Sequence, residues 1–242
     1  ANTSASAGGV LFVMDYSGNQ WVQRGNVLEG PNYRSYYGFG VNLSGDGNML
    51  AFSSREAGYQ VYVYDWNVGQ SLWVFRGTVH STFASGGYDQ LRLSKNGQVI
   101  GNGYDYYQFV NNDWQKMGDS FTGTMTVSQL SDDGRTVARV VADTTYIHKF
   151  VGTNWIQKGV YFESETERVH LSGDGNVFFR VYDSTINGEP TLSPMKLFEY
   201  TVTVSNGKYY LNGIETPTIT FNSGVSYTFL QDDSSNIGHQ LL

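Results

Sequence analysis

Short runs in which apolar and polar side chains alternate recur along the whole chain. The clearest lie at residues 10–14, 60–64, 106–110 and 146–150. A period of two, in segments rich in β-branched and aromatic residues, predicts β-strands. No segment shows the 3.6-residue period of an amphipathic helix, so we expect an all-β protein.

Two short units repeat between these runs. A turn unit, Leu-Ser-x-x-Gly, occurs four times with its serines at Ser44, Ser94, Ser131 and Ser172. A second unit, Trp followed four residues later by Gly, begins at Trp21, Trp73, Trp114 and Trp155. The two units alternate along the chain, which indicates one structural element repeated several times.

The repeated residues carry specific structural expectations. Asp-Gly and Asn-Gly pairs provide the positive φ that tight hairpin turns need. We therefore expect positive φ at the four turn glycines, which are Gly47, Gly97, Gly134 and Gly175. We expect Trp21, Trp73, Trp114 and Trp155 to occupy equivalent positions, mostly buried between neighbouring sheets.

Each repeat holds about four strands in roughly 40 residues, which is the period of a propeller blade. The sequence thus predicts a β-propeller of four or five blades over residues 1–199. The first Trp unit has no turn unit before it, and the turn unit at Ser172 has no Trp unit after it. Two interpretations follow: the strands near residues 10–25 complete the last blade, or the array is truncated.

Residues 200–242 have a different pattern. Asn206-Gly207 predicts a hairpin turn, and the alternating stretches around it predict the first strands of a β-sandwich. Too few strands are present for a complete sandwich. We expect an apolar face at Ile219, Phe221, Tyr227 and Phe229 that a neighbouring chain, or residues missing from a fragment, would cover. The alternative is that the segment folds back and packs on the last blade of the propeller.

The repeat also resembles a known group. Residues 39–44, 62–64 and 73–77 match β-propeller repeats of surface and secreted proteins of marine microbes and their viruses. This resemblance covers about residues 10–200 and implies a propeller at an extracellular or virion surface, but no activity. Residues 200–242 resemble the start of a cupredoxin-like β-sandwich. That resemblance places a copper ligand near His239, but the chain has no cysteine to complete such a site.

Composition excludes several classes of protein. Only 15% of the 242 residues are charged and the net charge is −7, which argues against disorder and nucleic-acid binding. No run of 18 apolar residues occurs, so we expect no membrane span. The absence of cysteine excludes disulfides and leaves the compartment open. Because the chain begins at Ala1, we expect either a removed leader or a fragment of a longer chain.

Catalytic and metal motifs are not apparent. The four histidines have no zinc spacing, and no Gly-x-Ser-x-Gly motif occurs. The acidic turns near Asp46 and Asp174 superficially suggest calcium loops but lack the distal Glu. No pair of carboxylates is singled out by its spacing. We therefore expect no cofactor, no metal and no enzymatic activity.

Aromatic side chains are the remaining candidates for ligand contact. Trp66 stands in a turn-rich stretch, and Tyr36, Tyr104 and Tyr106 belong to clusters of tyrosines; these rings could stack on sugars. The competing interpretation is that they fill the space between blades. The sequence thus predicts a non-enzymatic structural or binding module of an exterior assembly, with other protein chains as partners. A carbohydrate-binding adhesion propeller and a secreted hydrolase are the alternatives.

Overall fold

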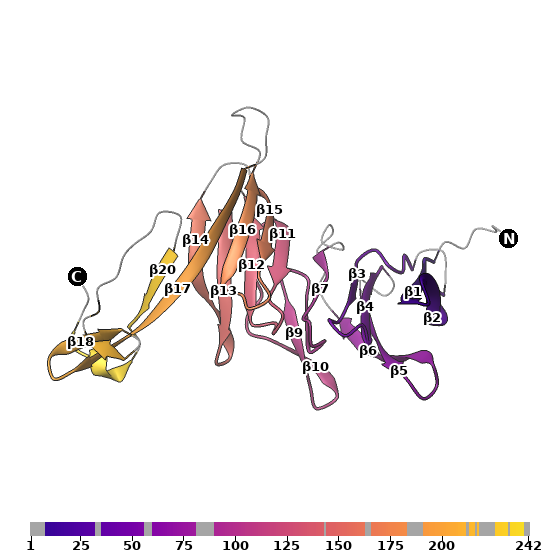
Figure 1. Cartoon of the computed structure of the whole chain (residues 1–242), viewed down its shortest axis with the longest axis horizontal. Coiled ribbons are helices and arrows are strands. Elements are labelled where there is room, and N and C mark those ends of the chain that lie inside the picture. Colours follow the sequence, from indigo (N-terminus) through magenta and orange to yellow (C-terminus); the bar gives the residue numbers. More distant parts are fainter. Residues whose placement is uncertain are drawn as a thin grey trace.

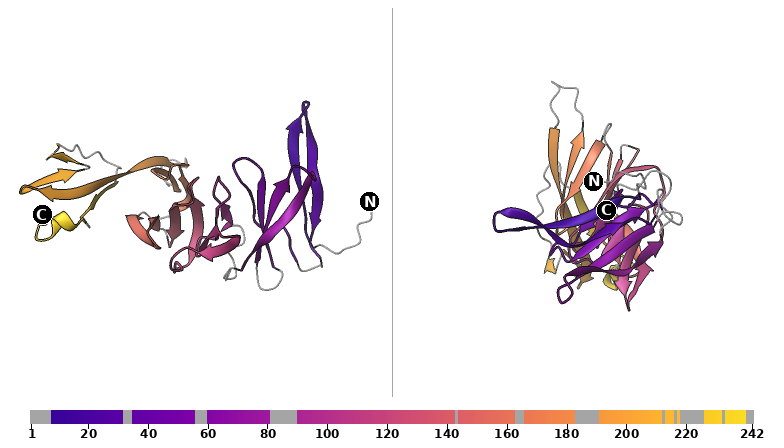
Figure 2. Two further views of the ribbon diagram at one scale, coloured as in Figure 1. Left: turned by 90° about the horizontal axis from the view of Figure 1, so that it is seen from below. Right: turned by 90° about the vertical axis from the view of Figure 1, so that its right-hand side faces the viewer.

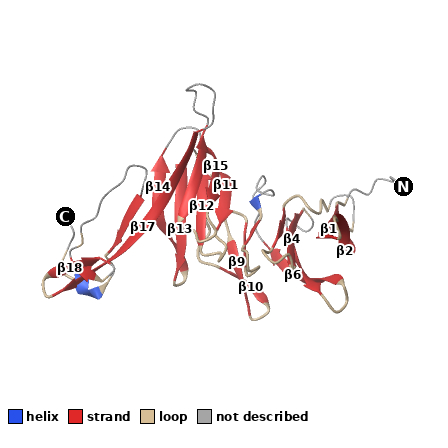
Figure 3. Ribbon diagram, in the orientation of Figure 1, coloured by secondary structure: helices blue, strands red, loops and turns tan. Residues whose placement is uncertain are grey.

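The computed structural model describes residues 8–31, 35–55, 60–80, 90–142, 144–162, 166–182, 191–211, 213–215, 217, 226–231 and 233–239. Within these ranges the chain is nearly all-β, and its short 3₁₀ segments include Ser234–Asn236 (Figure 3). The described part contains no helix long and apolar enough to cross a membrane.

Three four-stranded antiparallel sheets form the middle of the molecule and are propeller blades (Figure 1). Blade 1 consists of β3 (Val41–Leu43), β4 (Met49–Ser54), β5 (Gln60–Asn67) and β6 (Leu72–His80). Blade 2 consists of β7 (Arg92–Leu93), β8 (Val99–Gly101), β9 (Tyr106–Val110) and β10 (Asp113–Lys116). Blade 3 consists of β11 (Met125–Leu130), β12 (Thr136–Val141), β13 (Thr144–Val151) and β14 (Asn154–Phe162).

Two further sheets flank these blades. The N-terminal hairpin, β1 (Val10–Ser17) and β2 (Gln20–Glu29), precedes blade 1. The terminal sheet follows blade 3 and consists of β15 (Thr166–Leu171), β16 (Val177–Tyr182), β17 (Thr191–Ser205), β18 (Lys208–Leu211), β19 (Ile214–Glu215) and β20 (Ser226–Leu230). Each blade packs on the next through a buried apolar cluster.

The turn unit is stabilised by its own side chains. Ser44 Oγ donates to Asp46 Oδ1 at 2.6 Å and accepts from the amide of Met49 at 2.9 Å. Equivalent bonds join Ser94 to Asn96, Ser131 to Asp133 and Ser172 to Asp174. The four turn glycines have φ of 68°, 71°, 74° and 71°, the left-handed region that favours glycine.

The turns also tie neighbouring blades together. The amide of Gly45 donates to the carbonyl of Lys95 at 2.7 Å, and that of Lys95 donates to Asp132 at 2.9 Å. The amide of Asp132 in turn donates to Gly173 at 2.7 Å. One backbone hydrogen bond thus links each turn to its equivalent in the next sheet, which fixes the stacking order of the blades.

The repeated tryptophans share one register. Trp21, Trp73, Trp114 and Trp155 lie opposite Tyr16, Trp66, Phe109 and Phe150 in their hairpins. Trp73 and Trp155 are buried, but Trp21 is 66% exposed. The expectation of burial is therefore wrong for Trp21, because no sheet of the described chain packs against its face.

The row of blades is open. β1 and β2 pair with each other and with no strand of the terminal sheet. The N-terminal hairpin and the terminal sheet lie at opposite ends of the molecule (Figures 1 and 2). The interpretation in which the N-terminal strands complete the last blade is therefore wrong, since β17 takes the place beside β16.

A single strand connects the propeller region to the C-terminal segment. β17 pairs with β16 over residues 191–196, with β20 in parallel over 197–201, and with β18 over 202–205. The predicted boundary between residues 199 and 200 thus falls inside this strand, because the strand pattern continues through it. Ile219 and Phe221, expected on an apolar face, lie outside the described residues.

Candidate functional site

Every blade has a leading face, directed at the sheet before it, and a trailing face, directed at the sheet after it. In blade 1 the leading face is a stack of aromatic rings. Phe52 lies 5.7 Å from both Tyr62 and Tyr64, and Tyr64 lies 5.5 Å from Phe75. Phe52, Tyr62 and Tyr64 belong to the apolar cluster shared with Leu11 and Val13 of the N-terminal hairpin.

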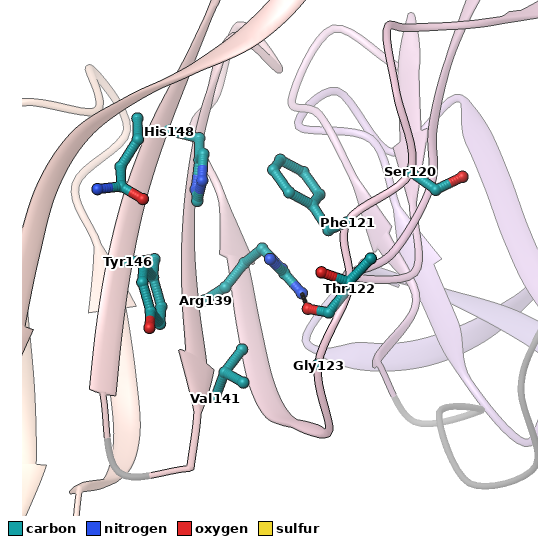
Figure 4. A pocket seen from close by; sticks show the side chains of 9 residues that line it. Ser120, Phe121, Thr122, Gly123, Arg139, Val141, Tyr146 and His148 are labelled. Carbon is teal, nitrogen blue, oxygen red and sulfur yellow. Dashed lines mark hydrogen bonds between the residues drawn. The ribbon is translucent and has the colours of Figure 1, made fainter.

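The same register positions of blade 3 are polar. Arg139 lies opposite Tyr146 on the neighbouring strand, which is the place of Phe52 and Tyr62 in blade 1. His148 lies opposite Gln157, which is the place of Tyr64 and Phe75 in blade 1. These side chains surround a pocket of about 380 Å³. The loop before β11 supplies its other wall, at Ser120, Phe121, Thr122 and Gly123 (Figure 4).

Arg139 is the most buried charged group in this pocket, with 3% of its surface exposed. Its Nε donates to the carbonyl of Gly103 at 2.7 Å, and its Nη2 donates to the carbonyl of Thr122 at 3.2 Å. The guanidinium carbon lies 4.3 Å from the ring centre of Phe121. Burial lowers the pKa of Arg139, while nearby tyrosines, Tyr106 foremost, act in the opposite direction.

His148 faces the same pocket and is 9% exposed. Its ring lies 4.6 Å from Phe121 in an edge-on arrangement. Burial, followed by the positive charge of Arg139, lowers the pKa of His148 to about 4, so the imidazole is neutral at pH 7. Its Nδ1 is buried and has no hydrogen-bond partner in the described chain.

The lining of the pocket has one cation and no carboxylate. Tyr146, Gln157 and Thr122 add polar groups, and Phe121 and Val141 add apolar surface. Figure 4 shows the side chains of Arg139 and His148 and the ring of Phe121 around the same space. This set of groups can accept an anionic or hydroxylated small molecule.

A second candidate site is the leading face of the N-terminal hairpin. Five large side chains share this face, and their exposed fractions are 58% for Val10, 60% for Phe12, 37% for Met14, 62% for Tyr16 and 66% for Trp21. On the opposite face, Leu11 and Val13 pack against the buried cluster of blade 1. The hairpin thus holds the outer half of a blade, with one face covered and the other open.

The other end of the row exposes a trailing face. Phe179 of β16 stands seven residues after the turn serine, like Ala51, Gly101 and Ala138 in blades 1 to 3. Those three residues are buried by the following sheet, whereas Phe179 is 41% exposed. The two ends of the row therefore expose the two opposite halves of a blade-to-blade contact.

The aromatic residues expected to contact ligands lie on different sheets. Trp66 is half-buried in blade 1, 5.4 Å from Trp73 and under the guanidinium of Arg24. Tyr36 is 38% exposed and lies 4.9 Å from the guanidinium of Arg55. The structure does not combine these two residues with Tyr104 and Tyr106 of blade 2 into one site.

Tyr104 and Tyr106 also serve the packing of blade 2. The hydroxyl of Tyr104 accepts a hydrogen bond from the amide of Met125 at 3.2 Å. Tyr106 is 1% exposed, and burial raises its pKa to about 12. The expectation that Tyr106 stacks on a ligand is therefore wrong, because its ring packs against Trp155 and Phe121 in the core.

The acidic turns use their carboxylates internally. The hydrogen bond from Ser44, followed by bonds from Asn48, lowers the pKa of Asp46 to about 2. Asp174 makes the same bonds with Ser172 and Asn176. In the part of the chain that the structure describes, no group of three or more His, Asp or Glu residues is placed to hold a metal ion.

Comparisons with known proteins bear on the fold alone. No family model and no curated protein matches the chain. A functionally unknown protein from Desulfotomaculum acetoxidans DSM 771 is 10% identical with a TM-score of 0.50, over 86% of this chain and 78% of that one.

Two other solved structures have lower TM-scores. A putative 6-phosphogluconolactonase from Bacteroides fragilis NCTC 9343 is 14% identical with a TM-score of 0.47, over 79% of this chain and 66% of that one. The Cps50 (Swd1) β-propeller domain of Myceliophteria thermophila is 11% identical with a TM-score of 0.49, over 66% of this chain. The chain spans 52% of that domain's length.

Proposed function

We propose that this chain is a non-enzymatic structural module whose copies join head to tail into an ordered assembly. The observation that carries the proposal is the uncovered leading face of the N-terminal hairpin. Exposed apolar patches of this kind mark interaction sites in soluble proteins. An exterior setting, such as a virion or a cell surface, is part of the proposal and is supported by the composition of the chain.

The partner that fits this face best is a propeller sheet. The hairpin is attached to blade 1 by the same contact that joins blades 2 and 3. Trp73 Nε1 donates to the carbonyl of Arg24 at 3.0 Å, and Trp155 Nε1 donates to the carbonyl of Met117 at 2.8 Å. The hairpin therefore follows the blade register, and its leading face suits the trailing face of another blade.

A second copy of the chain offers such a face at its terminal sheet, where Phe179 is exposed. Contact between the leading end of one copy and the trailing end of another is heterologous. Contacts of this type generate rings when the rotation closes and filaments when it does not. Within the described residues the two ends do not meet, since they lie at opposite extremes of the molecule (Figure 2).

A carbohydrate-binding function is the second candidate. Tyr16 and Trp21 lie 5.2 Å apart on the open face, and exposed aromatic rings can stack on sugars. In that case the chain would bind glycans as a monomer.

The apparent mass, measured by light scattering coupled to size-exclusion chromatography at several protein concentrations, distinguishes these two functions. We expect the apparent mass to rise with concentration for the wild type and to remain that of a monomer for Trp21→Ser. Val22→Ser is the matched control, because Val22 is 45% exposed on the other face of the same strand. A wild type that stays monomeric and retains glycans on an array would overturn the assembly proposal.

A further inference from the structure

We propose that the pocket between blades 2 and 3 binds a small organic carboxylate, which pairs with the guanidinium of Arg139. This binding site is independent of the proposed assembly, since it lies in the middle of the row and away from both exposed ends. The argument rests on the partners of Arg139, on the groups around it and on the size of the space.

A buried cation without a counter-charge is the first observation. Removing a charge from water is costly unless the charge is paired and hydrogen-bonded. Arg24 and Arg76 are less buried than Arg139, yet Asp15 and Asp65 provide them with carboxylate partners. No carboxylate of the described chain forms an ion pair with Arg139.

Blade 2 shows how the fold neutralises a buried charge at these positions. Asp105, which corresponds in register to Tyr146, has a side chain only 4% exposed and pairs with Lys116 at 2.9 Å. Lys116 corresponds to Gln157. Blade 3 thus keeps a buried charge on this face but lacks the internal partner, so an external anion is the group that would complete the site.

Arg139 retains donors for such an anion. A guanidinium has five N–H groups. The carbonyls of Gly103 and Thr122 take one each, from Nε and Nη2. The N–H groups of Nη1 have no partner in the described chain, and guanidinium N–H groups match the geometry of a carboxylate.

His148 supports the same ligand. Its ring is neutral, and the buried Nδ1 has no partner in the described chain. A neutral imidazole has one ring N–H, so His148, which lines the pocket, can donate a single hydrogen bond. An anion beside Arg139 would cancel part of the positive potential that disfavours protonation of His148.

The shape of the pocket favours an organic acid over an inorganic ion. Its volume of about 380 Å³ falls in the lower part of the range of small-molecule sites. Phe121 and Val141 provide apolar contact, while Tyr146 and Gln157 provide polar groups. A short hydroxylated carboxylic acid satisfies all of these groups together.

Isothermal titration calorimetry with four probes tests the proposal: glucuronate, glucose, acetate and inorganic phosphate. We expect glucuronate to bind at least about tenfold more tightly than glucose, its uncharged analogue, because only glucuronate forms charge-assisted hydrogen bonds with the guanidinium. Equal affinity for glucose and glucuronate, or no heat with either carboxylate, would overturn the proposal. Tighter binding of phosphate than of both carboxylates would also overturn it.

The variants identify the residue responsible. Arg139→Met should lose glucuronate binding, and Arg139→Lys should weaken it while keeping the charge. Arg92→Met is the matched control, because Arg92 Nε also donates to a carbonyl of a neighbouring blade, that of Ser128 at 2.8 Å, outside this pocket. An equal loss in Arg92→Met and Arg139→Met would show a merely structural role.

The wild type provides a readout that does not depend on any variant. In ¹H–¹⁵N spectra of the imidazoles, saturating glucuronate should raise the pKa of His148 toward its ordinary value, and glucose should leave it unchanged. The same pKa with both probes would contradict the placement of the carboxylate beside Arg139.

Discussion

Trp21 and Trp155 occupy the same register position, opposite Tyr16 and Phe150, yet Trp21 is 66% exposed whereas Trp155 is 8% exposed. The difference comes from their neighbours. Met117 and Tyr106 of blade 2 contact Trp155, while no described sheet precedes the hairpin that carries Trp21. The tryptophan of the repeat therefore stabilises the fold at position 155 and is available to a partner at position 21.

The two tryptophans should differ in their effect on stability. Trp155→Ala should lower the free energy of unfolding by about 3–5 kcal/mol, because it removes a buried ring from a packed cluster. Trp21→Ala should change it by about 0.5 kcal/mol or less at a concentration where the protein is monomeric. Urea unfolding followed by far-UV circular dichroism measures both values. Similar losses for the two variants would contradict their different environments.

Alanine substitutions at two glycines with nearly equal φ distinguish the cost of backbone strain from the cost of overpacking. Gly134 has φ of 74°, and a Cβ there would lie 2.5 Å from Cβ of Val99. Gly207 has φ of 72°, with nothing within 4 Å. Gly207→Ala should cost about 1 kcal/mol through φ alone, and Gly134→Ala should cost about 1–3 kcal/mol more through overpacking. Chemical denaturation measures the loss in free energy of unfolding for both variants. Equal losses would contradict the close approach of the Gly134 turn to Val99 of blade 2.

His148 should make stability depend on pH. Its pKa is about 4 in the folded chain and about 6.5 when unfolded, so the unfolded state binds more protons between these values. Stability should therefore be full above pH 6.5 and decrease as the pH falls toward 4, by about 2–3 kcal/mol from this group.

Urea titrations at several pH values between 7.5 and 4 test this prediction on the wild type and on His148→Gln. The His148→Gln substitution should remove most of the dependence of the free energy of unfolding on pH that is attributed to His148. His170, which is exposed, provides the control through His170→Gln. An unchanged slope in His148→Gln would show that His148 is not held neutral in the folded chain.

The repeat and its turns could be predicted from the sequence because they depend on local interactions. Ser131 bonds to Asp133 two residues away, and Gly134 takes its positive φ within the same turn. Burial was harder to predict, since it depends on which sheet comes next. Tyr106 and Tyr107 are adjacent residues of one strand, yet Tyr106 faces the core shared with blade 3 and Tyr107 packs toward blade 1.

The candidate pocket was not predicted, although the sequence contains its signal. Eight residues after the turn serine stand Phe52, Asn102 and Arg139 in blades 1 to 3. A charged residue at a position that is aromatic in another repeat indicates a different environment between blades. The lack of a carboxylate partner could not be predicted, because it depends on the loop that places Phe121 and Thr122 beside Arg139.

Mixing two variants tests the head-to-tail assembly most directly. Trp21→Ser damages the leading end and keeps the trailing end, whereas Phe179→Ser damages the trailing end and keeps the leading end. Analytical ultracentrifugation should find each variant monomeric alone and a one-to-one dimer in the equimolar mixture, because one intact end of each kind remains. A mixture that stays monomeric, or a Phe179→Ser variant that self-associates like the wild type, would contradict the proposed assembly.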